Sequence, residues 1–195
     1  MTIFYQQSGT RGEQDFSKTL TSRDRGSLRF FTPDSIEQEY KFRAPTDATQ
    51  SLIIPDRGVQ IWGVPSGAAG VVQKMAVGDL VLLIGHLSPK NVEFGRFFYG
   101  GRITYILPYE DFDFSRRLWG DGGFPLIFFM QGALIDYTWL QFCEDFRFKP
   151  TYFIAGHIVR VPPERLAKSV YRTQSALAER LRIQDEGLRE TYGSG

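Results

Sequence analysis

Two carboxylates and a lysine in the N-terminal third are the first side chains that suggest chemistry. Asp34, Glu39 and Lys41 occur together in "PDSIEQEYK", a loose match to the acidic-acidic-lysine set of metal-dependent nucleases. Such a site needs carboxylates from neighbouring strands to hold a divalent ion, with the lysine near the attacking water. The few residues between Asp34 and Glu39 leave too little chain for that crossing, so a nuclease is retained only as an alternative.

The histidines and the cysteine form no pattern for a metal or a nucleophile. His86 and His157 are far apart in the chain, and Cys143 is the only cysteine. Zinc needs three or four converging ligands, and the acidic neighbours of Cys143 in "LQFCEDF" disfavour a thiolate. We therefore expect no metal, no cofactor and no catalytic residue. A binding domain is favoured over an enzyme.

Two tryptophans lie at the edges of glycine-rich turns, where an indole is well placed to face a ligand. Trp62 ends an apolar run before "GVPSGAAG", and Trp119 precedes Gly120, Gly122 and Gly123 in "LWGDGGFPLIFF". The first glycine loop is not a P-loop, but its backbone N–H groups can approach a ligand at the start of a helix. Trp139, in "DYTWLQF", is expected in the core, like most of the aromatic residues that make up 15% of the chain.

Short strands with a few short helices must position these residues. Apolar runs closed by glycine or proline predict strands over 51–55, 58–64, 80–87, 94–107, 124–135 and 151–161. Helical spacing predicts short helices over 68–79 and 136–146, and residues 27–42 read as a strand and a helix beginning at Asp34. The predicted class is α+β: a small curved mixed β-sheet or open barrel flanked by short helices.

The chain divides into three parts by composition. Residues 1–26 are polar and are predicted to be a flexible N-terminal segment. Residues 27–161 form the predicted binding domain. Residues 162–195 follow Pro162-Pro163 and place Leu166, Val170, Leu177 and Leu181 on one helical face, which predicts an amphipathic C-terminal helix or linker.

Composition and charge exclude several classes of protein. The formal net charge is +1, so no strong overall field favours nucleic acid, although a local basic face is allowed. No apolar run reaches the roughly 18 residues of a membrane span, and the N-terminus lacks the order of a signal peptide. With one cysteine and no internal disulfide, a cytoplasmic protein with no membrane partner is expected.

The order of these segments resembles the YTH and EVE domains of the PUA-like superfamily. "IWGVPSGAAGVVQKMAVGDLVLL", "FGRFFYGGRITYI" and "LWGDGGFPLIFF" carry the resemblance, over roughly residues 52–161. Those domains are small curved sheets that bind nucleic acids, many of them through a modified base. Gly63 stands where YTH domains have a small polar residue after the first tryptophan.

The resemblance implies a reader of modified nucleic acid, with Trp62 and Trp119 as walls of an aromatic cage for a flipped base. The expected ligand is N6-methyladenine in DNA, with a modified cytosine and RNA left open. The chain is expected to be the specificity module of a McrB-type restriction system and to serve a GTPase or nuclease partner. Contacts to the base edge are expected from Gly63, Val64, Ser66 and Asp121. Phosphate contacts are expected from basic residues in or beside loops: Arg57, Lys74, Lys90, Arg96, Arg102, Arg116 and Arg117.

A second function remains open beside the nuclease. The predicted C-terminal helix and any exposed aromatic residues would suit a protein-interaction module. A titration with methylated and unmethylated oligonucleotides separates these three functions.

Overall fold

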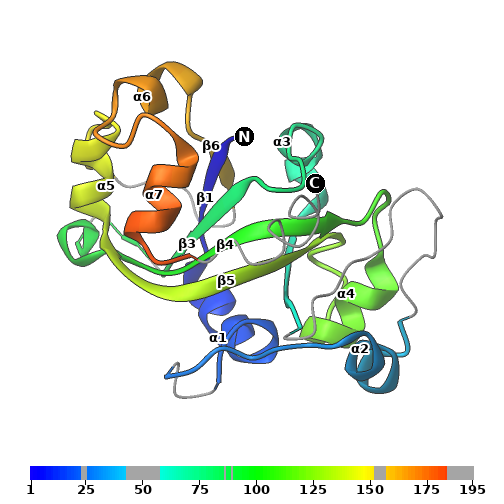
Figure 1. Cartoon of the computed structure of the whole chain (residues 1–195). Helices are drawn as coiled ribbons and strands as arrows, with labels where there is room; N and C mark the ends of the chain where they lie inside the picture. Colours follow the sequence, from blue (N-terminus) through cyan, green and yellow to red (C-terminus); the bar gives the residue numbers. More distant parts are fainter. Residues whose placement is uncertain (23–25, 43–57, 86, 89, 152–156, 184–195) are drawn as a thin grey trace, which may run out of the picture.

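The fold is a single curled sheet with short helices on both faces, seen in the computed structural model in Figure 1. The structure describes residues 1–22, 26–42, 58–85, 87–88, 90–151 and 157–183. The strands are β1 (Ile3–Gln7), β2 (Gln60–Val64), β3 (Leu80–Ile84), β4 (Arg96–Ile106), β5 (Leu126–Thr138) and β6 (Ile158–Arg160). Their order is β2-β5-β4-β3-β1-β6, with β1 and β3 parallel and all other neighbours antiparallel. The predicted α+β class with a curved mixed sheet is confirmed.

The helices are short and begin and end at recognisable signals. They are α1 (Gly9–Thr19), α2 (Pro33–Tyr40), α3 (Ala69–Val72), α4 (Phe112–Trp119), α5 (Trp139–Asp145), α6 (Pro163–Lys168) and α7 (Gln174–Arg180), with 3-10 turns η1 (Ser66–Ala68) and η2 (Val92–Phe94). Thr32 and Thr138 form capping boxes at α2 and α5, which satisfy otherwise unpaired N–H groups. Among the described helices, none is long and apolar enough to cross a bilayer.

The sheet is buried on both faces, which explains its continuous apolar strands. Side chains alternate along a strand, so Leu80 and Leu82 of β3 face a cluster under α5 and α7. Val81 and Leu83 face the opposite cluster under α1 and α3. A third cluster lies between α2, α4 and the β2–β5 edge. The longest strands, β4 and β5, change register at Phe97/Tyr99 and Ile103/Tyr105, on either side of the Gly100-Gly101 pair.

Residues 3–19 are built into the sheet and its packing, so the prediction of a flexible segment over 1–26 is wrong for this part. All five side chains of β1 are buried, and β1 pairs with β3 on one side and β6 on the other. Phe16 of α1 is fully buried, with its ring 5.2 Å from that of Trp62. Long-range strand pairing stabilises a segment whose polar composition, including the buried Gln6 and Gln7, hid it.

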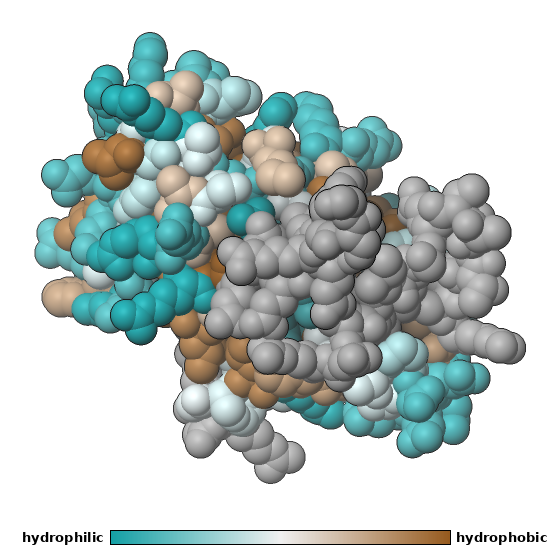
Figure 2. Space-filling model, viewed as in Figure 1, coloured by the Kyte–Doolittle hydropathy of each residue, from teal (hydrophilic) through white to brown (hydrophobic). Residues whose placement is uncertain are grey.

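The C-terminal part is two short helices packed on the sheet, which corrects the prediction of one amphipathic helix. Ser169–Thr173 separates α6 from α7, and Val170 within it is exposed. Leu177 and Leu181 are buried in the cluster under α7. On the face shown in Figure 2, hydrophilic residues cover most of this region, while hydrophobic residues gather beside α1. Leu177 and Leu181 are therefore not free to dock a partner.

Candidate functional site

Trp62 and Trp119 come together although they are far apart in the sequence. Trp62 lies in β2 and Trp119 is the last residue of α4, and both side chains are buried. Their ring centroids are 6.3 Å apart and their planes meet at 78°, which is an edge-to-face contact. This geometry is favourable between aromatic rings. The two residues singled out by their glycine-rich context therefore share one site.

The turn after Trp119 is held in place by a small hydrogen-bond network. Gly120 has a φ of 88° and ends α4 in the left-handed conformation that favours glycine. The Ser115 hydroxyl donates to the Asp121 carbonyl oxygen and accepts from the Phe124 N–H, at 3.1 Å each. The Asp121 carboxylate accepts from the Gly123 N–H at 2.8 Å. These bonds fold the turn back against α4 and bring Phe124 beside Trp119, with ring centroids 5.8 Å apart.

Between the tryptophans and this turn lies a small cavity of about 20 Å³. Its lining is Gln6, Ser8, Asp15, Trp62, Gly63, Trp119 and Phe124. That volume holds about one water molecule. Because the two indoles are nearly perpendicular, they do not form two parallel walls. The cavity is a closed site with aromatic walls and polar groups between them.

The polar groups of the cavity come from β1 and α1, which sequence reasoning missed. The Trp62 indole N–H donates to the Gln6 side-chain oxygen at 2.8 Å. The Trp119 indole N–H donates to the Thr19 hydroxyl at 3.4 Å. Asp15 and Gln6 are buried, at 4% and 2% exposure. The aromatic and β-branched run "TIFY" was the available signal for a strand here.

Lys18 joins the two sides of the cavity. Its ammonium donates to the Asp15 carboxylate at 2.8 Å and to the Trp119 carbonyl oxygen at 2.7 Å. Asp15 is in α1, whereas Trp119 ends α4. The Lys18 carbonyl oxygen in turn accepts from the Arg29 guanidinium at 2.8 Å. A charge-assisted bridge therefore ties α1 to the C-terminus of α4.

Of the four residues predicted to contact a base edge, Gly63 alone lines the cavity. Val64 is buried in β2, and the exposed Ser66 donates to Glu110 at 3.1 Å. Asp121 is part of the turn that carries Phe124. None of these three is among the lining residues of the cavity.

The predicted phosphate-binding residues are spread over several elements. Arg116 and Arg117 are exposed on α4 and share that helix with Trp119. Lys74 follows α3, whereas Lys90 and Arg96 flank η2, which packs against α5. Arg57 lies outside the described residues.

Some of these basic side chains already have acceptors. Arg116 pairs with Asp113 and Arg96 with Asp136, while Arg117 donates to the Tyr40 and Lys41 carbonyl oxygens. Arg102 is buried in β4 and donates to the Gly78 carbonyl oxygen at 3.2 Å, which corrects its placement on a basic rim. Its buried strand position leaves it unable to reach a phosphate.

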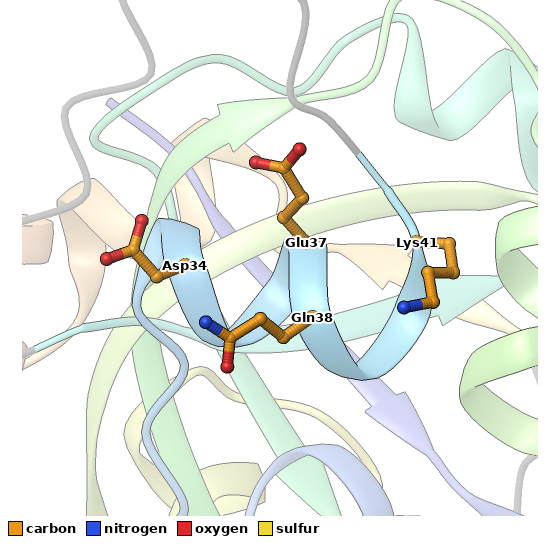
Figure 3. Close-up of a pocket in the computed structure, with 4 residues that line it drawn as sticks. All are labelled: Asp34, Glu37, Gln38 and Lys41. Atoms are coloured by element: carbon orange, nitrogen blue, oxygen red, sulfur yellow. The ribbon is translucent and has the colours of Figure 1, made fainter.

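The acidic-acidic-lysine set does not form a nuclease site. Asp34 and Glu39 both lie on α2, where five residues of separation turn the side chains about 140° apart. Glu39 instead pairs with Arg29 at 2.9 Å. Asp34, Glu37, Gln38 and Lys41 line an open hollow of about 440 Å³, and Figure 3 shows their ends pointing in different directions. These residues do not converge on an ion.

Other groups considered for chemistry are also unsuited to it. Within the described ranges, no group of three or more His, Cys, Asp or Glu side chains could hold a metal ion. Cys143 is buried, and this desolvation raises the pKa of its thiol to about 12, so it is a poor nucleophile. His157 is exposed just before β6. His86 lies outside the described residues.

Comparison with known proteins finds a likeness in structure but not in sequence. No protein-family model matches the chain, and no curated protein matches it. Among solved structures, it is similar to the N-terminal domain of Thermococcus gammatolerans McrB bound to m5C DNA, with a TM-score of 0.58 and 18% identity. The likeness covers 93% of this chain and 98% of that one. The chain therefore has the fold of a McrB N-terminal domain.

Proposed function

We propose that this chain binds modified DNA without catalysis, by taking a flipped, methylated base between Trp62 and Trp119. The observation that carries the proposal is the edge-to-face contact of these two indoles over a cavity lined by Gln6 and Asp15. The shared fold supports it, because the similar McrB domain was solved with m5C DNA. Aromatic walls suit a planar methylated base, and buried polar groups suit its edge.

A base needs more room than the cavity offers, so binding requires the site to open. A base stacked on two rings needs near-parallel faces about 7 Å apart, twice a carbon–carbon contact distance. The perpendicular rings, with centroids 6.3 Å apart, must therefore reorient. Stacking contributes about 1–3 kcal/mol per base. Extruding the base from a duplex costs a few kcal/mol, so two walls are needed to offset it.

The polar lining favours a base that keeps an exocyclic N–H. The Asp15 carboxylate is an acceptor only, and the Gln6 carboxamide can both accept and donate. N6-methyladenine, the base that the sequence resemblance implies, and 5-methylcytosine both carry an N–H on their exocyclic amine. We propose that Asp15 accepts this N–H after leaving Lys18. Arg116 and Arg117, on the same helix as Trp119, are the residues best placed for flanking phosphates.

A binding module of this kind has a natural place in a modification-dependent restriction system. It would supply recognition of the modified site, while a GTPase or nuclease partner would supply cleavage. The alternative of an interaction module loses its main support, because Leu177 and Leu181 are buried against the sheet. The nuclease alternative loses its support because Asp34 and Glu39 project from different sides of α2.

A fluorescence anisotropy titration tests the proposal. The probes are matched duplexes that contain one N6-methyladenine, one 5-methylcytosine or no modification. We expect at least one methylated duplex to bind more tightly than the unmodified duplex. Trp62→Phe and Trp119→Phe should reduce this preference. Trp139→Phe, a buried tryptophan in the cluster under α5 and α7, is the matched control and should retain it.

Two results would reject the proposal. Equal affinity of the wild-type protein for all three duplexes would exclude recognition of these methyl groups. Unchanged preference in Trp62→Ala and Trp119→Ala, with both variants folded by circular dichroism, would exclude the two tryptophans as the walls of the site.

A further inference from the structure

The Lys18 ammonium links the two helices beside the cavity, α1 and α4. Lys18 and Asp15 are three residues apart on α1, whereas Trp119 is the final residue of α4. The Lys18 ammonium donates to the Asp15 carboxylate on α1 and to the Trp119 carbonyl oxygen on α4. In the described part of the chain, α1 and α4 pack directly against one another. If the cavity widens by moving α1 away from α4, Lys18 must lose either its bond to Asp15 or its bond to Trp119.

The bridge differs from an ordinary surface ion pair. The Asp15 side chain is 6% exposed and that of Lys18 is 42% exposed, so the carboxylate is screened from water while the ammonium enters from the solvent side. Its second acceptor is a terminal carbonyl of α4, where unsatisfied carbonyls and the helix dipole favour a cation. Both acceptors therefore hold the same charge in place.

The bridge also occupies the group that a base would need. Asp15 lines the cavity, yet its carboxylate accepts from Lys18 in the closed site. Lys18 donates to the Oδ1 atom of Asp15, so a ligand N–H that bonds to this same oxygen must displace the ammonium. A cavity of about 20 Å³ holds about one water molecule, so a base reaches Asp15 only after the site opens.

We propose that Lys18 is a positioning residue that latches the cavity shut and thereby sets the affinity of the site for a base. This inference rests on the proposed function, because it assumes that the cavity takes a base. When only a fraction of molecules is open, the apparent dissociation constant equals the intrinsic one divided by that fraction. Removing the latch raises the open fraction and tightens binding of a ligand that needs only the cavity.

The first test measures opening without any ligand. Lys18→Met keeps the apolar stem and removes the ammonium. Hydrogen exchange of the indole N–H groups, followed by NMR, should become at least several-fold faster for Trp119 and Trp62. The Trp139 indole, which packs in the cluster under α5 and α7, is an internal reference and should not change. Lys18→Arg retains donors for both acceptors and should restore slow exchange.

The second test measures affinity with ligands that have no phosphate. The probes are the nucleosides N6-methyl-2′-deoxyadenosine and 5-methyl-2′-deoxycytidine. Lys18→Met should bind the preferred nucleoside about 3- to 10-fold more tightly, the range expected for loss of one partly exposed charge-assisted bond. Lys168→Met, an exposed lysine on α6, is the control and should bind as the wild type does.

Each outcome has a distinct meaning. Unchanged indole exchange in Lys18→Met overturns the latch, whatever DNA binding shows. Weaker nucleoside binding with unchanged exchange also overturns it and makes Lys18 a ligand contact instead. Faster exchange with no nucleoside bound by either protein rejects the proposed function, whereas the latch on the cavity stands.

Loss of the ammonium leaves Asp15 buried without its cation, so Lys18→Met could fail to fold. The double variant Lys18→Met/Asp15→Asn removes that uncompensated charge. It should still show fast exchange at the Trp119 and Trp62 indoles. Slow exchange in the folded double variant would overturn the latch.

Discussion

Gly63 and Trp119 are in contact so close that no side chain fits between them. A Cβ atom at position 63 would lie 2.6 Å from the Trp119 indole and 2.6 Å from the Phe124 carbonyl oxygen. Real Cβ atoms do not approach other atoms this closely. The absence of a side chain at Gly63 therefore allows the indole to lie over β2. This contact explains why glycine, and not a small polar residue, follows Trp62.

Gly63→Ala should consequently destabilise the protein and displace Trp119. Overpacking of a buried site costs about 1–3 kcal/mol, and we expect a loss of this size in urea denaturation. Gly67→Ala is the control, because a Cβ there meets no atom within 4 Å, and its effect should be within about 0.5 kcal/mol. A fully stable Gly63→Ala protein with unchanged Trp119 fluorescence would contradict the packing described.

Asp15→Asn should weaken selection for an exocyclic N–H. N6-methyladenine offers one N–H to the carboxylate, whereas N6,N6-dimethyladenine offers none. Wild-type protein should prefer the monomethyl duplex by about 10-fold, the value of one buried hydrogen bond to a charged acceptor, and Asp15→Asn should reduce this ratio. Asp34→Asn, on the open face of α2, should leave the ratio unchanged. If Asp15→Asn kept the full ratio, Asp15 would not read the base edge.

Arg116→Gln should weaken DNA binding uniformly and lower its salt dependence. Each phosphate contact contributes about 0.9 to the slope of log K against log salt concentration, so the slope should fall by about one. Lys168→Gln, at an exposed lysine on α6 for which no phosphate contact is expected, is the control and should not alter the slope. The measurement is a series of anisotropy titrations at four salt concentrations. Equal slopes for Arg116→Gln and the wild type would place the DNA elsewhere.

The fold should lose stability at alkaline pH through its buried tyrosines. Burial raises the pKa of Tyr5 to about 12 and raises those of Tyr99 and Tyr137 further, whereas an unfolded tyrosine titrates near 10. Below pH 10 both states are protonated and stability is complete. Above it, only the unfolded chain releases the proton, so the free energy of unfolding falls up to the folded pKa.

This loss should amount to about 1 kcal/mol for each buried tyrosine at pH 11. Urea denaturation at pH 8, 10 and 11 measures it. Tyr5→Phe should show a shallower decline than the wild type over the same range. Identical declines for the two proteins would mean that Tyr5 is not protected in the folded state.

Local patterns were sufficient to predict the central strands of the sheet. The continuous apolar run 80–87 matches β3, because a strand buried on both faces needs apolar residues throughout. The alternating run 94–107 matches β4. The pattern around Trp119 was read as a turn only, and α4 was missed. Its eight residues include Arg116, Arg117 and Asp113, too short a helix for periodicity to show.

The polar half of the site could not be predicted in the same way. Gln6 and Asp15 belong to a segment whose composition suggested a loose terminus, and β1 is stabilised by pairing with β3 and β6. Such pairing is a property of distant segments, so it leaves no local signal. The break between α6 and α7 at Ser169–Thr173 could not be predicted for the same reason. The packing of Leu177 and Leu181 on the sheet, and not helix periodicity, decides where the helices end.

The sequence alone determined which residue types the site has: two indoles beside glycine turns and an apolar sheet to carry them. Only the tertiary structure decided that the indoles meet at 78°, that Gly63 makes room for Trp119, and that Lys18 reaches Trp119 across 101 residues. The physical reason is that propensity and periodicity act over a few neighbouring residues. The angle between two rings and the partner of a buried charge depend on how distant elements pack.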